Sequence, residues 1–128
     1  MIQIRRNTFE TNSSSTHSLV MCMKKDYNLW MKDKLWFIDC GAPSFVPWEN
    51  VIKFMREHYS SAQEDIETLI SEYEKNNMET VEDILSDYEI YSYSAWLDHS
   101  GAYERYSDSF ITPSGDEVVA FGFFGSSY

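Results

Sequence analysis

Cysteine is scarce in this sequence, which contains only Cys22 and Cys40. Neither residue belongs to a CxxC or Cys/His ligand pattern, and two cysteines are too few for a disulfide framework. We expect both thiols to be reduced and buried. The isolated histidines His58 and His99 have no second ligand at metal spacing, so the sequence predicts no metal site and no cofactor.

Long apolar segments are missing as well. No stretch of about 18 apolar residues occurs in the chain, and we therefore expect no membrane-spanning helix. Arg5 and Arg6 precede a polar run over residues 10–18 instead of the apolar segment of a signal peptide. These features predict a soluble, cytoplasmic protein that has no membrane partner.

Basic residues are scarce in the second half of the chain. Residues 1–59 hold eight Lys or Arg and six Asp or Glu, whereas residues 60–128 hold two Lys or Arg and fifteen Asp or Glu. Nearly all of the net charge of −11 therefore lies in the C-terminal half. Because duplex DNA and anionic membranes bind proteins through clustered Lys and Arg, this charge argues against either as a direct partner.

Apolar and aromatic residues are abundant. Hydrophobic residues make up 43% of the 128 residues and aromatic residues make up 16%. That content offsets the loss of chain entropy on folding, so the sequence does not have the composition of a disordered chain. The length suits one domain, and no linker or internal repeat divides the chain. We expect a single domain over residues 1–128 with a substantial core.

Three central segments have the apolar periodicity of amphipathic helices. The first begins at Pro47, a residue suited to the first turn of a helix, and ends near Tyr59. The second spans residues 62–75, where apolar residues recur at i, i+4, i+7, i+8 and i+11. The third begins near Thr80 and continues the same kind of stripe over residues 81–88. These segments predict three consecutive helices.

Segments near both chain ends favour β-strands. The strand-like segments are residues 2–4, 19–23, 35–38, 91–97, 109–112 and 117–124. The last two flank the turn-forming residues 113–116 and predict a hairpin. The order of strands, three helices and strands predicts an α+β fold. In this fold a mostly antiparallel sheet, assembled from both chain ends, packs against about three central helices.

A polar segment, RRNTFETNSSSTHS, occupies residues 5–18. Its hydroxyl groups, backbone N–H groups and arginines are suited to binding phosphate. The residues of this alternative ligand loop are Arg5, Arg6, Asn12, Ser13, Ser14, Ser15, Thr16 and His17. A serine nucleophile with His17 as its base is a second interpretation. A hydrogen-bonded turn is the third, since these side chains readily bond their own backbone and no P-loop glycine or lysine is present.

Within that segment, residues 9–18 read FETNSSSTHS. This string resembles the N-terminal signature of small proteins from bacteriophages and Firmicute mobile elements. The resemblance is confined to the N-terminal end of the chain. It implies a phage or prophage origin, and hence a location in the cytoplasm of a host bacterial cell. It implies no catalytic or ligand-binding residues.

The two helices after residue 60 carry many acids and little compensating charge. Like charges lie three or four residues apart at positions 64 and 67, 79 and 82, 79 and 83, and 83 and 87. An ordinary exposed helix pairs Glu with Lys at these spacings, and each like-charged pair costs a few tenths of a kcal/mol. We infer that something other than stability favours the acids. A solvated helix face that aids solubility is the plainer interpretation.

Carboxylates on successive helical turns form a row whose spacing is comparable with that of phosphates along a DNA strand. The aromatic residues that follow are suited to cation–π contacts with Arg and Lys. We therefore predict a surface that binds a basic protein. Its residues are Glu64, Asp65, Glu67, Glu72, Glu79, Glu82, Asp83, Asp87, Glu89, Tyr91, Tyr93 and Trp96.

The small size, acidic charge and implied phage origin are together similar to those of anti-CRISPR proteins. That similarity implies a viral inhibitor that acts as a DNA mimic and binds a basic nucleic-acid-binding surface of a host defence nuclease, for example Cas9. No catalytic residue is predicted. Two alternatives remain open. One is a small nucleotide-binding or phosphate-binding protein or enzyme that uses residues 11–18, and the other is a virion or assembly component that self-associates through exposed strand edges.

Overall fold

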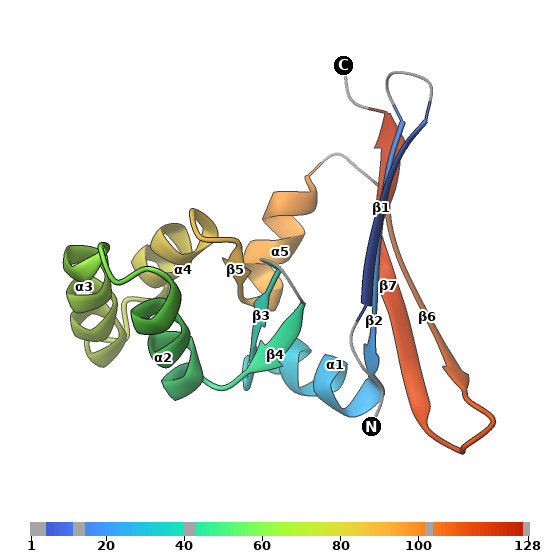
Figure 1. Ribbon diagram of the computed structural model, residues 1–128, viewed down its shortest axis with the longest axis horizontal. Helices are drawn as coiled ribbons and strands as arrows, with labels where there is room; N and C mark the ends of the chain where they lie inside the picture. The colour runs from blue at the N-terminus through green and yellow to red at the C-terminus, as the bar shows by residue number, and fades with distance from the viewer. Residues whose placement is uncertain (1–4, 12–14, 40–42, 102–103, 127–128) are drawn as a thin grey trace.

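The computed structural model describes residues 5–11, 15–39, 43–101 and 104–126. Five helices and seven strands in these ranges form two antiparallel sheets, which confirms the predicted α+β class (Figure 1). In chain order the elements are β1 (Arg5–Thr11), β2 (Ser15–Met23), α1 (Lys24–Met31), β3 (Trp36–Ile38), β4 (Ser44–Val46), α2 (Trp48–His58), α3 (Gln63–Glu74), α4 (Met78–Ser86), β5 (Ile90–Tyr91), α5 (Tyr93–Ser100), β6 (Glu104–Ile111) and β7 (Glu117–Ser126).

The larger sheet has the strand order β1-β2-β7-β6 and is assembled from both chain ends, as the sequence predicts. Its two central strands, β2 and β7, pair antiparallel with Val20 opposite Phe121. The predicted C-terminal hairpin is also present, because β6 pairs with β7 up to Ile111 opposite Glu117. The N–H of Thr112 donates to the carbonyl of Asp116 at 2.9 Å and closes the turn.

The smaller sheet has the order β4-β3-β5, and both of its faces are covered. All three residues of β3 are buried, in agreement with the uninterrupted apolar run at 36–38. Successive side chains of a strand point to opposite faces. Trp36 and Ile38 accordingly belong to one hydrophobic cluster, and Phe37 belongs to another. This sheet is therefore the wall between two cores.

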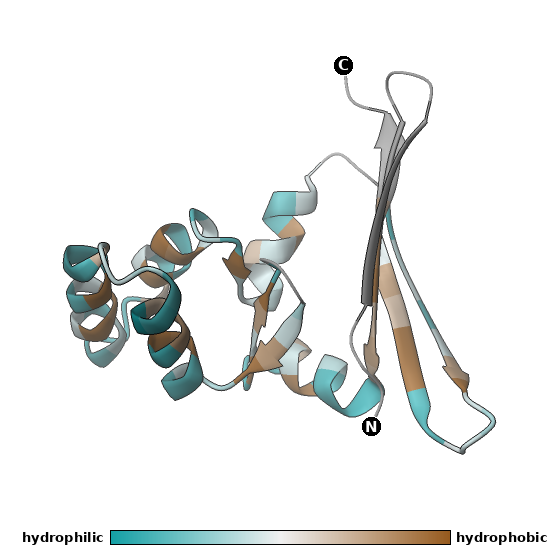
Figure 2. Ribbon diagram, viewed as in Figure 1, coloured by the Kyte–Doolittle hydropathy of each residue, from teal (hydrophilic) through white to brown (hydrophobic). Residues whose placement is uncertain are grey.

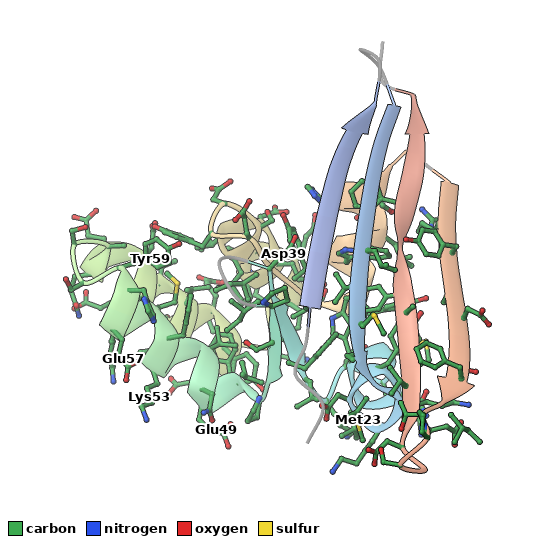
Figure 3. The ribbon with its side chains drawn as sticks, turned by 45° about the vertical axis from the view of Figure 1, so that its right-hand side comes forward. Met23, Asp39, Glu49, Lys53, Glu57 and Tyr59 are labelled. Carbon is green, nitrogen blue, oxygen red and sulfur yellow. The ribbon has the colours of Figure 1, made fainter. Side chains whose placement is uncertain are left out.

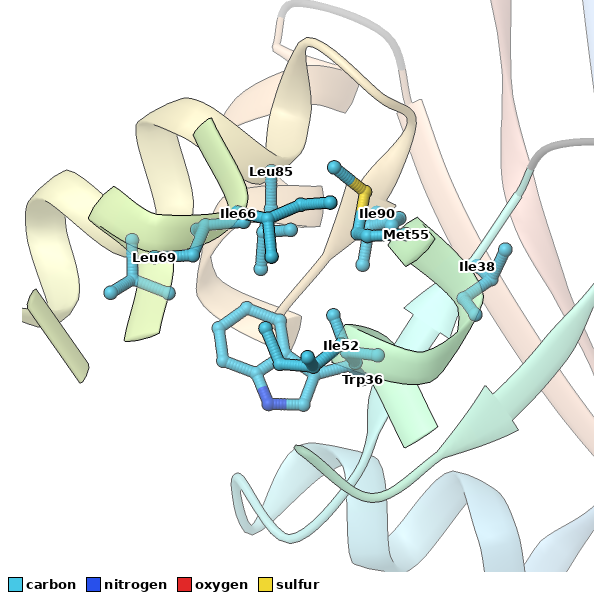
Figure 4. Packing of buried hydrophobic residues seen from close by; sticks show 10 residues of the cluster. Trp36, Ile38, Ile52, Met55, Ile66, Leu69, Leu85 and Ile90 are labelled. Atoms are coloured by element: carbon cyan, nitrogen blue, oxygen red, sulfur yellow. The ribbon is translucent and has the colours of Figure 1, made fainter. Parts of the chain in front are cut away.

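The first core lies between the smaller sheet and the helices α2, α3 and α4 (Figures 1 and 4). The apolar stripes read from the sequence face this core, with Met55, Ile66 and Leu85 all fully buried. Two of the three predicted helices begin close to their expected positions, whereas α4 begins at Met78, before Thr80. The central helices thus pack on the smaller sheet, and the expectation that they cover the chain-end sheet is wrong.

The second core lies between the two sheets and includes residues of α1 and α5 (Figure 1), and the strands that border it contain hydrophobic residues (Figure 2). Trp30 of α1 is fully buried at its centre, and its indole N–H donates to the carbonyl of Tyr91 at 3.1 Å. Six aromatic rings lie with centroids 5.0 to 5.9 Å from that of Trp30, namely Tyr27, Phe37, Phe45, Tyr93, Trp96 and Phe121. The aromatic content of the sequence is concentrated here.

The strand predicted over residues 91–97 is wrong, because the chain there leaves the two-residue strand β5 and forms α5. The Ser92 side chain accepts a hydrogen bond from the Ala95 N–H at 3.1 Å and caps the helix. The buried residues of α5, Trp96 and Ser100, are four positions apart, which is the helical spacing. The sequence predicted no regular element at α1, β1 or β4, and the strand predicted over residues 2–4 lies outside the described residues.

The structure describes one of the two cysteines and all of the helices named above. Cys22 is a free, fully buried thiol, as predicted, and burial raises its pKa to about 12, with the charge of Asp26 adding to the effect. Cys40 lies outside the described residues. No helix among the described residues has both the length and the apolar content needed to cross a membrane.

The second core provides a direct test of the fold. Replacing Trp30 with Ala removes the ring that six others contact and the indole N–H that donates to the Tyr91 carbonyl, so we expect a loss of about 3–5 kcal/mol in unfolding free energy. The neighbouring Met31 is 39% exposed, and Met31→Ala should change stability by less than about 0.5 kcal/mol. Urea unfolding followed by circular dichroism measures both. Equal effects would contradict the packing described here.

Candidate acidic interface

The polar N-terminal segment forms a β-hairpin in which β1 and β2 pair from Arg5 opposite Met21 to Thr11 opposite Ser15. Residues 12–14, which hold three residues of the alternative ligand loop (Asn12, Ser13 and Ser14), lie outside the described residues. Residues 15–17 lie between β1 and β7, with Thr16 opposite both Glu10 and Gly125. Their backbone groups are thus directed at neighbouring strands. This arrangement does not support a phosphate cradle built from the backbone of Ser15, Thr16 and His17, and Arg5 and Arg6 lie on β1.

The predicted acidic residues fall into two groups. On α3, Glu64, Glu67 and Glu72 line a shallow hollow of about 390 Å³. Between α4 and α5 lies a cleft of about 590 Å³, and its acidic lining residues are Glu79, Glu82, Asp83, Glu89 and Asp98. The predicted residues Asp65 and Asp87 line neither. Helices α3 and α4 pack against each other, so the two groups lie on neighbouring elements.

Two half-buried acids of α3 have local hydrogen-bond partners. Asp65 accepts a hydrogen bond from the hydroxyl of Tyr88, which raises the pKa of this tyrosine to about 12, with burial as a smaller cause. Glu72 accepts from the side-chain amide of Asn77 at 2.7 Å and lies 3.7 Å from the Lys75 ammonium. These carboxylates stabilise the helix layer in addition to carrying charge.

The half-buried acid of α4, Glu82, is tied to the start of α5. Its carboxylate accepts a hydrogen bond from the Ser92 hydroxyl, whose oxygen in turn accepts from the Ala95 N–H. Ser92 is only 6% exposed. One buried hydroxyl therefore caps α5 and fixes the position of the Glu82 carboxylate. The acidic side of α4 and the orientation of α5 are set together.

The exposed acids have fewer partners, and among them Glu67 accepts a hydrogen bond from the side-chain amide of Gln63 at 3.5 Å. Those on α3, α4 and the residues that follow are Glu64, Glu67, Glu74, Glu79, Asp83, Asp87 and Glu89. Among the residues whose side chains the structure describes, the ion pairs within 4.0 Å join Lys24 to Glu117 and Lys75 to Glu72, so no lysine or arginine there pairs with the seven exposed acids. The outer face of α2 differs, because Lys53 lies between Glu49 and Glu57 (Figure 3).

One of these acids has an unusual backbone conformation. Glu89 follows α4 with φ of 59°, in the left-handed region. Its N–H donates to the carbonyl of Ser86 at 3.1 Å, and its carbonyl accepts from the N–H of Asp39 at 2.9 Å, so the chain is held in this turn. Glycine and asparagine adopt such a conformation readily, whereas other L-residues lose roughly 1–2 kcal/mol. A glutamate here is not explained by local stability.

The three predicted aromatic residues are buried or half-buried. Tyr91 is 3% exposed and Trp96 is 5% exposed, and both belong to the second core. Tyr93 is half-buried, with its ring centroid 5.0 Å from that of Trp30. The assignment of Trp96 to a partner-binding surface is therefore wrong, because it lies among the aromatic residues around Trp30, whereas Tyr91 still lines the cleft between α4 and α5.

Sequence reasoning also missed residues that line the cleft. Ala95, Asp98 and His99 of α5 line it at i, i+3 and i+4, the spacing of one helix face. The imidazole of His99 stacks on Tyr91 with centroids 4.8 Å apart. A strand interpretation of residues 91–97 places alternate residues on a common face and obscures this grouping. The serine at the N-cap was the signal that could have revealed it.

Comparisons with known proteins add no further constraint, since no protein-family model, no curated protein and no solved structure matches this chain. Within the described ranges, no group of three or more His, Cys, Asp or Glu side chains is arranged to hold a metal ion. The distinguishing feature of this part of the molecule is therefore a set of exposed carboxylates on rigid helices.

The bond between Ser92 and Glu82 generates a stability prediction. Ser92→Ala removes both the cap of α5 and the donor to Glu82, so we expect a loss of about 1–2 kcal/mol. Ser94→Ala, at an exposed position two residues further on, should change stability by less than about 0.5 kcal/mol. Urea unfolding of the two variants measures the difference. A harmless Ser92→Ala change would show that the hydroxyl does not hold the two elements together.

Proposed function

We propose that this protein is a non-enzymatic inhibitor that binds the basic nucleic-acid-binding surface of a host defence nuclease and competes there with nucleic acid. The observation that carries the proposal is the set of seven exposed acids on and after α3 and α4, none of which pairs with a lysine or arginine whose side chain the structure describes. An anionic surface without internal counter-charge is complementary to a groove lined by Lys and Arg. Phosphates in such a groove and carboxylates of an inhibitor satisfy the same donors.

The mechanism is electrostatic competition. A net charge of −11 accelerates association with a cationic surface, and the helices hold the carboxylates in fixed positions so that little ordering accompanies binding. Once bound, the inhibitor occupies the path of the nucleic acid. Affinity between such surfaces decreases as salt screens the charges.

The backbone of Glu89 supports the same proposal. A glutamate in a left-handed turn lowers stability, yet it adds a carboxylate to the cleft between α4 and α5. Strained positions of this kind cluster at functional sites. We infer that the charge at this position was retained for binding.

A Cas9-like nuclease is the first target to test. Its channel for the RNA–DNA heteroduplex is positively charged and contacts the backbone of the nucleic acid. The N-terminal string at residues 9–18 supports a phage or mobile-element origin by resemblance, and phages encounter such nucleases. The charge and small size of the chain are similar in type to those of anti-CRISPR proteins.

Neutralising the exposed acids in groups tests this mechanism. One variant carries Glu64→Gln and Glu67→Gln on α3, and a second carries Glu79→Gln and Asp83→Asn on α4. Each change keeps side-chain size and removes charge, so the folded state should be retained. We expect slower association with the guide-loaded nuclease and about tenfold or greater loss of inhibition of DNA cleavage for the combined variant.

The matched control is Glu49→Gln with Glu57→Gln on α2, which removes two negative charges from a face that also carries Lys53. This pair should leave inhibition within about twofold of that of the unmodified protein, since exposed charges outside an interface change affinity little. If the α2 double variant and the α4 double variant lose inhibition equally, the effect depends on net charge alone and not on the acids of α4. Undiminished inhibition by the combined variant would refute acidic mimicry, and absence of binding by the unmodified protein would remove this nuclease as the target.

A single substitution at Glu89 separates stability from binding. Glu89→Asn places a residue suited to the left-handed conformation, and we expect stability to rise by up to about 1 kcal/mol while inhibition weakens. Glu79→Asn removes the same charge from the first turn of α4, where Asn has a lower helix propensity, and should lower stability slightly while also weakening inhibition. Thermal unfolding and cleavage assays measure both. A stabilised variant with full inhibitory activity would remove Glu89 from the interface.

A further inference from the structure

A third hollow, of about 320 Å³, lies on the other side of Glu82 from the acidic cleft, where α4 and α5 begin beside the turn after α1. It combines carboxylates with aromatic and apolar surface. The lining residues that matter chemically are Asp33, Trp36, Tyr73, Met78, Glu82 and Ser94. Its size falls within the range of pockets that accept small ligands or single side chains.

The aromatic wall of this pocket is rigid. The ring of Tyr73 stacks on Trp48 with centroids 4.0 Å apart and planes inclined by 6°. Trp36 is 5% exposed and lies 5.8 Å from Trp48 between ring centroids. Tyr73 itself remains 37% exposed and lines the pocket. An aromatic ring that is held in place and still reachable is a good partner for a planar cation.

One carboxylate of the pocket is held in place by a neighbouring side chain, and the other lies on a backbone turn of defined conformation. The Glu82 carboxylate is held by the hydroxyl of Ser92. Asp33 lies at the rim in a left-handed turn with φ of 62°, and its N–H donates to the carbonyl of Trp30 at 3.0 Å. None of the residues that line this pocket is a lysine or arginine. The two acids therefore line the hollow from separate elements, and no lysine or arginine lines it with them, although Lys32 and Lys34 flank Asp33 in the sequence.

We propose that this pocket takes an arginine side chain of the protein partner, an inference that rests on the proposed function because the partner there is basic. A guanidinium group is planar and weakly hydrated, so it stacks on an aromatic ring while its N–H groups bond carboxylates. Its aliphatic stem packs against apolar surface such as Met78. A lysine ammonium is a strongly hydrated point charge and uses the ring less well.

This assignment gives the two acidic regions different tasks. The exposed acids of α3 and α4 attract a cationic surface over a distance, which determines how fast the partners meet. The pocket holds one side chain in a defined place, and buried arginine anchors of this kind account for much of the affinity at protein interfaces. Glu82 lines both the cleft and the pocket and connects the two.

The test uses the full chain and N-acetyl-L-arginine amide as the probe, without any partner protein. We expect the probe to cause saturable NMR shifts at the Met78 methyl group and the Tyr73 ring, in the millimolar range typical of a single side chain. N-acetyl-L-lysine amide should bind at least about threefold more weakly. An equal response to both probes, or shifts that rise without saturation, would overturn the assignment.

Two charge insertions provide a matched comparison. Ser94→Lys places an ammonium at the pocket, and Thr68→Lys places the same charge on the exposed face of α3. Ser94→Lys should lower affinity for the arginine probe by about tenfold, whereas Thr68→Lys should leave it within about twofold. Equal effects of the two variants would overturn the proposal.

Two substitutions that retain the fold complete the test. Asp33→Asn removes a charge at a residue whose left-handed conformation asparagine also adopts, and Tyr73→Leu removes the ring. Each should weaken probe binding at least about threefold. Unchanged binding in both would overturn the pocket assignment while leaving the acidic mimicry intact. The opposite combination is also informative. If the unmodified protein binds the arginine probe as expected, but the charge-neutralised α3 and α4 variants still inhibit the nuclease, the proposed function is refuted while the pocket assignment stands.

Discussion

The arrangement of the molecule depends on the burial of β3 from both sides. Trp36 and Ile38 pack under α2, α3 and α4, while Phe37 packs toward α1, α5 and the larger sheet. Through Phe37 opposite Tyr91 and Ile38 opposite Ile90, the same short strand fixes β5, and β5 directly joins α4 to α5. The geometry of the acidic cleft is therefore set by the packing of a three-residue strand between two cores.

The distribution of charge follows from that packing. The apolar sides of α3 and α4 are used by the first core, so their acids can only lie at its margin or face solvent. Asp65 and Glu82 lie at the margin and accept hydrogen bonds from Tyr88 and Ser92. Core burial is large enough to offset the mutual repulsion of the remaining acids, which costs a few tenths of a kcal/mol for each neighbouring pair. A strong core is thus what allows an uncompensated anionic surface.

The sequence predicted the elements whose local pattern agrees with their final environment. α2 and α3 have long stripes of period 3.6, and β6 and β7 flank a turn-forming cluster, so these were recognised. α5 was not, since Tyr and Ser alternate at residues 91–94 and only the N-cap contact of Ser92 distinguishes helix from strand. The acids themselves could be located from spacing alone. The pocket between Asp33 and Glu82 could not, because tertiary packing, and no local rule, brings these two together.

The pairing of β2 with β7 has a consequence for the synthesis of the chain on the ribosome. The first core draws only on residues 36–90 and can form while the rest is being translated, whereas the second also needs Val119 and Phe121. Until β7 emerges, β2 presents one open edge and the indole of Trp30 lacks part of its surroundings. The larger sheet can therefore be completed only after β7 has emerged from the ribosome, and until then the open edge of β2 remains available for incorrect pairing.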